Sequence, residues 1–200
     1  MNPQQVYDLY RKDPLQDMWD YSPMLRDVAK GNILEIGARG GVSTAAFLLG
    51  VEANGGHVYS MDINPDCATL YEGHPQWTFI HANSGNVEDM RKAVRQFKFD
   101  GWLDILLIDG DHSYDAVCRD IGNWVQWVCK GGLIFMHDVD PQVSAEQIAA
   151  WGWVKDEPRR AYDEFVAATG WEASILPGRF GMGRIVKGQL SGIDSHSKSL

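Results

Sequence analysis

Acidic residues and histidines follow directly after two apolar runs of this chain, and these residue types could bind a metal ion and move a proton. Asp109 and His112 come after the run Ile105–Ile108, and His137 and Asp138 come after the next run. If both runs are neighbouring parallel strands, their carboxyl ends meet at one sheet edge, where ligands bind in open α/β sheets. The pattern therefore predicts a candidate active site built from these four side chains.

The chemistry expected of this set is metal-assisted proton transfer. Asp109, His137 and Asp138 would offer oxygen and nitrogen ligands suited to a divalent cation such as Mg²⁺ or Mn²⁺. Such a cation could hold a substrate hydroxyl and lower its pKa, and His112 is placed to accept the proton. Two simpler interpretations stay open: His137 could bond to the backbone at a strand end, and Asp138 could bind cofactor or water.

A glycine-rich turn follows an earlier apolar run, Ile33–Ile36, and contains Gly37, Gly40 and Gly41. Glycine permits the backbone angles of a strand-to-helix turn and lets a ligand approach the main chain closely. The spacing does not match the G-x-G-x-x-G of dinucleotide loops, and Glu35, two residues before Gly37, would repel a diphosphate. A cationic ligand suits this acid better. We therefore expect S-adenosylmethionine, which carries an ammonium and a sulfonium group.

A second acid, Asp62, ends the apolar segment His57–Met61. Its carboxylate could accept hydrogen bonds from both ribose hydroxyls of the cofactor. The alternative is that Glu35 and Gly37 only complete a strand and that Asp62 caps a helix. The two acids at this spacing favour the cofactor interpretation.

Length and composition limit the classes of partner. The chain has 200 residues, 44% of them hydrophobic, which is enough for one domain with a core. A net charge of −9 argues against nucleic acid and favours a small-molecule substrate. Three cysteines without metal-type spacing fit a reducing compartment. A polar N-terminus and the lack of a membrane-length apolar run predict a cytoplasmic protein without a membrane partner.

Short apolar segments alternate with helical ones, which predicts a parallel sheet with helices on both faces. The expected strands are Ile33–Ile36, His57–Met61, Thr78–His81, Ile105–Ile108 and Leu133–Met136. The expected helices are Ser43–Gly50, Pro65–Tyr71, Val87–Phe97 and Tyr114–Val128, the last one ended by Lys130–Gly132.

The pattern changes near the C-terminus. Pro158–Thr169 reads as an amphipathic helix, and the apolar patches Trp171–Leu176 and Gly183–Val186 flank a short glycine-rich loop. Two strands joined in this way predict an antiparallel hairpin at one edge of the sheet.

Four motifs of the chain together resemble a known family. They are L-E-I-G-x-x-x-G-x-S-T, M-D-I-N-P, L-I-D-G-D-H-x-Y and G-G-L-I-x-x-H-D-V. The combination resembles class I S-adenosylmethionine-dependent methyltransferases, and more narrowly the small-molecule O-methyltransferase branch that includes methyltransferase domain 24. The resemblance covers about Asn32–Val139, with weaker likeness up to Val186. It implies a Rossmann-like, doubly wound α/β fold with a mostly parallel seven-stranded sheet and an antiparallel C-terminal hairpin.

The resemblance also implies a cofactor site. The positions on the loop that receives the methionine part are Glu35, Gly37, Gly41 and Ser43. Asp62 matches the acid that binds ribose, and Asn83 and Ser84 match positions beside adenine. Arg39 departs from the glycine found in many class I loops.

The resemblance further implies a metal centre. Asp109 matches the first metal ligand of cation-dependent O-methyltransferases and counts among the cofactor-binding positions as well. His137 and Asp138 match the acidic or amide pair that completes such a site, although an acid is usual at the position of His137. His112 falls where catechol-type relatives keep a lysine base, so we expect His112 and Asp109 to be catalytic.

The expected function is transfer of a methyl group from S-adenosylmethionine to a hydroxyl of a small molecule, a sugar first and a phenol next, with assistance from a divalent metal. Two alternatives stay open: an NAD(P)-dependent oxidoreductase that uses Asp62 for the same ribose contact, and a non-catalytic protein that retains a Rossmann-like fold. We expect an N-terminal helical segment (1–30), a methyltransferase domain (31–187) and a disordered tail (188–200). The aromatic N-terminal segment could serve a homodimer contact or a lid over the site.

Overall fold

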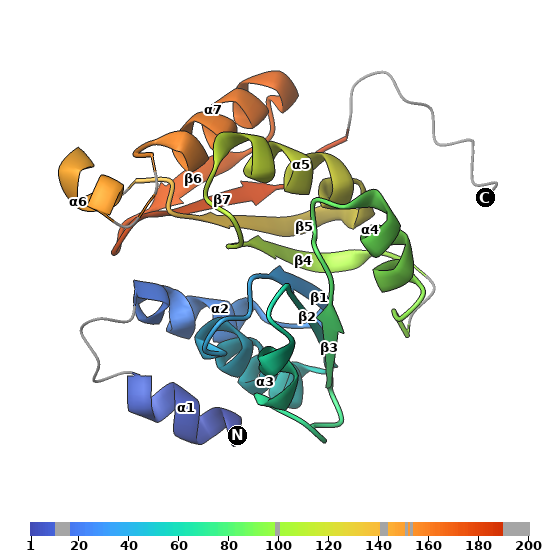
Figure 1. Ribbon diagram of the computed structural model, residues 1–200. Helices are drawn as coiled ribbons and strands as arrows, with labels where there is room; N and C mark the ends of the chain where they lie inside the picture. Colours follow the sequence, from blue (N-terminus) through green and yellow to red (C-terminus); the bar gives the residue numbers. More distant parts are fainter. Residues whose placement is uncertain (11–16, 99–100, 141–143, 151, 153, 190–200) are drawn as a thin grey trace.

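A central sheet covered by helices on both faces forms the computed structural model, which describes residues 1–10, 17–98, 101–140, 144–150, 152 and 154–189 (Figure 1). The strand order is β3-β2-β1-β4-β5-β7-β6, in which β1 to β5 pair in parallel and β7 pairs antiparallel with both of its neighbours, β5 and β6. The strands are β1 (Gly31–Ile36), β2 (Gly56–Asp62), β3 (Trp77–His81), β4 (Leu103–Ile108), β5 (Val128–His137), β6 (Ala173–Leu176) and β7 (Met182–Val186). The predicted seven-stranded, mostly parallel α/β sheet with a C-terminal hairpin is confirmed.

Each face of the sheet carries its own set of helices. One face is covered by α1 (Pro3–Tyr10), α2 (Ser22–Val28) and α3 (Val42–Asn54) (Figure 1). The other is covered by α4 (Val87–Val94), α5 (Tyr114–Trp124) and α7 (Glu157–Thr169) (Figure 1). The remaining elements are α6 (Ala145–Ala150) and the 3₁₀ turns η1 (Asp17–Tyr21), η2 (Pro65–Thr69) and η3 (Val125–Trp127).

Two hydrophobic cores, one on each face, hold these layers together. Leu25, Phe47 and Phe135 are fully buried in the core under α2 and α3, and Tyr59 and Trp124 are fully buried in the other. Helix α3 is buried along most of its length because α1 and α2 pack on its outer side. The sheet and its central helices therefore form a fixed frame for the loops at the strand ends.

The sequence prediction was wrong about where the helix beginning at Tyr114 ends. Helix α5 stops at Trp124, a 3₁₀ turn follows, and β5 starts at Val128, so Lys130–Gly132 lies inside a strand and does not end a helix. Gly131 has a φ of 80°, and the pairing of β5 with β4 shifts register between Leu103 and Ile105. Glycine thus marks an irregularity within the strand.

Two other predicted helices also differ from the structure, one in type and one at its end. The segment predicted as a helix from Pro65 is the short 3₁₀ turn η2, and the helix predicted from Val87 to Phe97 ends at Val94. Among the residues that the structure describes, no helix combines the length and apolar character needed to cross a membrane. The expected tail lies mostly outside the described residues.

Candidate active site

The loops that follow β1 and β4 touch each other through their backbones. The N–H of Gly37 donates to the carbonyl of Met61 in β2 at 2.8 Å, and the N–H of Asp109 donates to the carbonyl of Ile36 in β1 at 2.9 Å. A Cβ on Gly37 would lie 2.1 Å from the carbonyl oxygen of Asp109, and Gly37 has a φ of 91°. Only glycine satisfies both the left-handed backbone and the close approach. The glycine-rich turn therefore lies directly against the first residue of the acid–histidine group.

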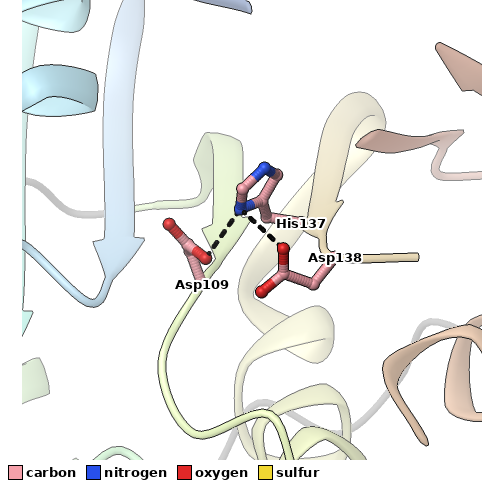
Figure 2. A group of neighbouring side chains, drawn as sticks. All are labelled: Asp109, His137 and Asp138. Atoms are coloured by element: carbon pink, nitrogen blue, oxygen red, sulfur yellow. Dashed lines mark hydrogen bonds and ion pairs between the residues drawn. The ribbon is translucent and has the colours of Figure 1, made fainter. Parts of the chain in front are cut away.

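The acid–histidine cluster comprises Asp109, His112, His137 and Asp138. The Nδ1 atom of His137 lies 3.1 Å from Oδ1 of Asp109 and 3.5 Å from Oδ1 of Asp138, as Figure 2 shows. The Nε2 atom of His112 lies 2.9 Å from Oδ2 of Asp138 and 3.5 Å from Asp109. The structure thus brings together all four side chains that the sequence predicted for catalysis and metal binding.

Backbone geometry explains how two consecutive residues can face the same point. Successive side chains of an extended strand point to opposite faces, and His137 is the last residue of β5. Asp138 has a φ of 60°, outside the extended region. Its left-handed backbone breaks the alternation, so that His137 and Asp138 both approach Asp109. Asp tolerates this conformation better than most residues, and such strain is typical of functional sites.

Burial and charge set the protonation of the cluster. Burial alone would lower the pKa of each histidine, but contacts with Asp109 and Asp138 raise the pKa of His112 to about 10 and that of His137 to about 9. Burial would also raise the pKa of Asp109, but the charges and hydrogen bonds of both histidines hold it well below its usual range. Both imidazoles are therefore protonated at neutral pH in the metal-free cluster.

The donor set of this cluster fits a divalent cation. Asp109, His137 and Asp138 each offer one ligand atom, and these atoms lie within 4.8 Å of one another. Oδ1 of Asp138 and Nε2 of His137 are buried without a hydrogen-bond partner among the described residues. Buried polar atoms normally find a partner, and a cation that takes the carboxylate oxygens would supply one for Asp138.

Glu35 lies beneath the glycine-rich turn in a buried network of hydroxyl groups. Its carboxylate accepts a hydrogen bond from Ser43 at 2.9 Å, and the hydroxyls of Thr44 and Ser60 donate to it as well. Trp77 in turn donates to the Ser60 hydroxyl at 2.8 Å. Burial raises the pKa of Glu35 to about 7, although the three hydroxyls act in the opposite direction. Glu35 thus has three protein partners, and its contact with a cofactor stays a prediction.

Asp62 joins the end of β2 to the glycine-rich turn. Its Oδ2 atom accepts from the backbone N–H groups of Ala38 at 2.9 Å and Arg39 at 3.0 Å, and its Oδ1 atom accepts from Asn64 at 2.8 Å. These bonds fix the turn while part of the carboxylate stays exposed. Asp62 does not cap η2, because Asn64 does so.

The loop after β3 contains Asn83 and Ser84, the positions expected beside adenine. The Asn83 side chain accepts from Gly85 at 3.0 Å, and the Ser84 carbonyl accepts from the side chains of Asn123 at 2.9 Å and Trp124 at 3.1 Å. Helix α5 therefore fixes this loop. The backbone of Ala82 donates to the Asp62 carbonyl at 3.1 Å, which sets the loop beside the second predicted acid.

Some residues around the predicted site were missed from sequence. Thr44 and Ser60 complete the partners of Glu35, and the rings of Tyr21 and Phe180 lie against the His137 ring with centroids 5.6 Å and 6.3 Å away. The motif L-E-I-G-x-x-x-G-x-S-T contains Thr44, so a signal for it existed. Phe180 is far from the cluster in sequence and shows no such signal, whereas Tyr21 belongs to the aromatic N-terminal segment for which a homodimer contact or a lid over the site is the expectation.

Solved structures share this fold at low sequence identity. The MycE methyltransferase of the mycinamycin biosynthetic pathway, solved with Mg, S-adenosylhomocysteine and mycinamycin VI, is 18% identical with a TM-score of 0.66, and the match covers 98% of this chain but only 57% of MycE. The S-adenosylhomocysteine-bound methyltransferase PaMTH1 of Podospora anserina is 15% identical with a TM-score of 0.68, covering 92% of this chain and 87% of PaMTH1.

A third similar structure is the O-methyltransferase of Bacillus cereus in complex with S-adenosylhomocysteine, which is 18% identical with a TM-score of 0.62, covering 92% of this chain and 89% of the other. These likenesses show a Rossmann-like methyltransferase fold. The methyltransferase domain family (Methyltransf_24) matches residues 34–139, more than half of the chain. The chain therefore belongs to the methyltransferase domain family.

Proposed function

We propose that the protein transfers a methyl group from S-adenosylmethionine to a hydroxyl of a small molecule, assisted by a divalent cation. The observation that carries this proposal is the contact of the glycine-rich turn with the acid–histidine cluster, where Gly37 has no room for a side chain beside Asp109. The turn would hold the methyl donor and the cluster would hold the acceptor. The similar proteins solved with S-adenosylhomocysteine, one of them also with Mg, support both halves of the proposal.

Positioning is expected to carry most of the catalysis, because the sulfonium already activates the methyl group. The protein must align acceptor oxygen, methyl carbon and sulfur, and remove one proton. Asp109, His137 and Asp138 would hold Mg²⁺ or Mn²⁺, which when bound lowers the pKa of an acceptor hydroxyl.

His112 would accept the proton from the acceptor hydroxyl. A base must be neutral, and in the metal-free cluster the carboxylates raise the pKa of His112 to about 10 although burial opposes this. A cation on the same carboxylates would repel the imidazolium and lower the pKa of His112 towards neutrality. The base and the metal site are therefore expected to act together.

The acceptor proposed first is a sugar hydroxyl, and a phenolic hydroxyl comes second. MycE was solved with mycinamycin VI, which supports the natural-product class. Methyl transfer should be measured from labelled S-adenosylmethionine to methyl α-L-rhamnopyranoside and to catechol, with Mg²⁺ and with EDTA. We expect methyl transfer to one of these two acceptors, and we expect EDTA to abolish that transfer. Binding of NAD without binding of S-adenosylhomocysteine would instead favour the oxidoreductase alternative.

A further inference from the structure

Two segments far apart in sequence, residues 17–21 and 177–181, meet beside the acid–histidine cluster. The hydroxyl of Tyr21 donates to the carbonyl of Arg179 at 3.0 Å, and the N–H of Arg179 donates to Oδ2 of Asp20 at 2.7 Å. We call these two segments the clasp. Because each segment supplies a donor and an acceptor to the other, the N-terminal turn η1 and the β6–β7 loop behave as one unit.

Unusual backbone geometry holds the loop of the clasp against the end of β5. Phe180 has a φ of 62°, and a Cβ on Gly181 would lie 2.6 Å from the Cβ of Asp140. The N–H of Asp140 donates to the Phe180 carbonyl at 2.8 Å. A Cβ on Gly178 would lie 2.7 Å from the Tyr21 hydroxyl. The loop therefore packs so closely against the end of β5 and against Tyr21 that neither Gly178 nor Gly181 has room for a side chain.

The aromatic rings of the clasp contact His137 edge-on. The ring centroid of Tyr21 lies 5.6 Å from that of His137 at an interplanar angle of 75°, and the centroid of Phe180 lies 6.3 Å away at 83°. Tyr21 is buried and Phe180 is half-buried. Phe180 is therefore partly accessible next to His137, where an apolar part of a ligand could contact it.

The order of the strands indicates which ligand the clasp would meet. Apart from Asp109, the predicted cofactor positions follow β1, β2 and β3, whereas the clasp lies beside the end of β5 and the start of β7, with the acid–histidine cluster between the two groups. In-line methyl transfer requires the acceptor oxygen on the side of the methyl group opposite to sulfur. If the donor lies over the β1–β3 half, the acceptor must approach from the β5–β7 half.

We infer that Phe180 forms the acceptor-side wall of the active site and determines which acceptor hydroxyls reach the cluster, with the Tyr21–Arg179 and Asp20–Arg179 bonds holding that wall in place. This inference rests on the proposed function. Phe180 is the specificity-determining residue in it, and Tyr21, which is buried, and Asp20 act by positioning the loop.

Three variants test the wall. Tyr21→Phe keeps the ring and removes the bond to Arg179, Phe180→Asn removes the ring but keeps a residue that adopts the left-handed backbone, and Tyr162→Phe is the control. Tyr162 donates to the Ser174 carbonyl at 3.0 Å, the same kind of bond as that of Tyr21, on the far side of the hairpin. Steady-state kinetics should use methyl α-L-rhamnopyranoside and catechol, alongside titration with S-adenosylhomocysteine.

The expected result is an acceptor KM raised about five-fold in Tyr21→Phe, because the loop loses a bond that positions Phe180, and about ten-fold in Phe180→Asn. The ratio of kcat/KM between the two acceptors should change in Phe180→Asn, while S-adenosylhomocysteine affinity stays within two-fold and Tyr162→Phe matches wild type. If wild-type protein transfers a methyl group but Tyr21→Phe and Phe180→Asn both keep the wild-type acceptor KM and the wild-type ratio of kcat/KM, the inferred wall is wrong. That result would leave the proposed function intact. Wild-type protein that transfers no methyl group to either acceptor would overturn both.

Discussion

Glu35 is a buried carboxylate beneath the glycine-rich turn, and its contribution to the free energy of unfolding depends on pH. Its pKa rises from 4.5 to about 7, chiefly through burial, so the folded protein binds its proton more tightly than the unfolded chain does. The stabilisation that this proton provides is complete below pH 4.5 and is lost as pH rises through about 7. The hydroxyl groups around Glu35 reduce this loss without removing it.

Glu35→Gln should remove this pH dependence. We expect the free energy of unfolding of wild-type protein to fall by up to about 3 kcal/mol relative to the variant between pH 4.5 and pH 8, since one pKa unit corresponds to about 1.4 kcal/mol. Urea unfolding at a series of pH values measures the difference. Parallel curves for the two proteins across that range would show that the buried carboxyl is not the titrating group.

His112 is expected to act on the proton and not on the cofactor. His112→Ala should lower kcat by about 10²-fold or more, as for loss of a general base, while the dissociation constant of S-adenosylhomocysteine changes little. Kinetics and calorimetry on the same preparation measure the two quantities. Equal losses in turnover and affinity would speak against the base role.

At the scale of elements, strands were easier to predict than the ends of helices. All seven strands follow from apolar runs of strand length, and the central ones are apolar because they are buried between two helical layers, whereas the edge strand β6 is only half-buried. The end of α5 was missed because Val125 and Val128 continue the apolar spacing of the helix into η3 and β5. Apolar residues needed in the core look alike in a helix and in a buried strand.

The contact between the loops after β1 and β4 gives a prediction about glycine. Gly37→Ala would place a Cβ 2.1 Å from the Asp109 carbonyl oxygen, so we expect the loops to separate, stability to fall by about 3 kcal/mol or more, and S-adenosylhomocysteine binding to weaken strongly. Gly55→Ala is the matched control, because Gly55 has a φ of 80° and nothing within 4 Å of the added Cβ. Thermal unfolding and calorimetry compare them. Equal effects of both substitutions would assign the effect to φ alone.

At the scale of the whole molecule, the sequence predicted the acid–histidine cluster but not its surroundings. The four cluster residues, Asp109, His112, His137 and Asp138, follow neighbouring strands of one parallel sheet. Because ligands bind at the carboxyl ends of parallel strands, the sequence alone predicted that these residues would lie together. The Tyr21 ring lies directly against His137, and its hydroxyl donates to the carbonyl of Arg179. Such long-range contacts arise from packing of the N-terminal helices, and local sequence patterns carry no signal for them.

The charges of the assembled cluster predict that metal binding releases protons. Burial opposes protonation, but the carboxylates raise the pKa of His112 to about 10 and that of His137 to about 9. Mg²⁺ must therefore displace protons that the histidines hold at neutral pH. The affinity for Mg²⁺ should rise as pH increases from 7 to 9. Calorimetry in two buffers of different ionisation enthalpy counts the protons. Asp109→Asn should lose binding, whereas Asp111→Asn, an exposed neighbouring acid, should retain it. An affinity for Mg²⁺ that does not change with pH, or that is unchanged in Asp109→Asn, would contradict the metal-site assignment.

We expect the glycine-rich turn and the acid–histidine cluster to form one site for methyl transfer. The decisive experiment is a crystal structure with S-adenosylhomocysteine and Mn²⁺, because the anomalous signal of manganese locates the ion. We expect S-adenosylhomocysteine against Gly37 and Gly41 with its ribose at Asp62, and manganese bound by Asp109, His137 and Asp138. Manganese at other residues, or S-adenosylhomocysteine bound away from the glycine-rich turn, would show that the two do not form this site.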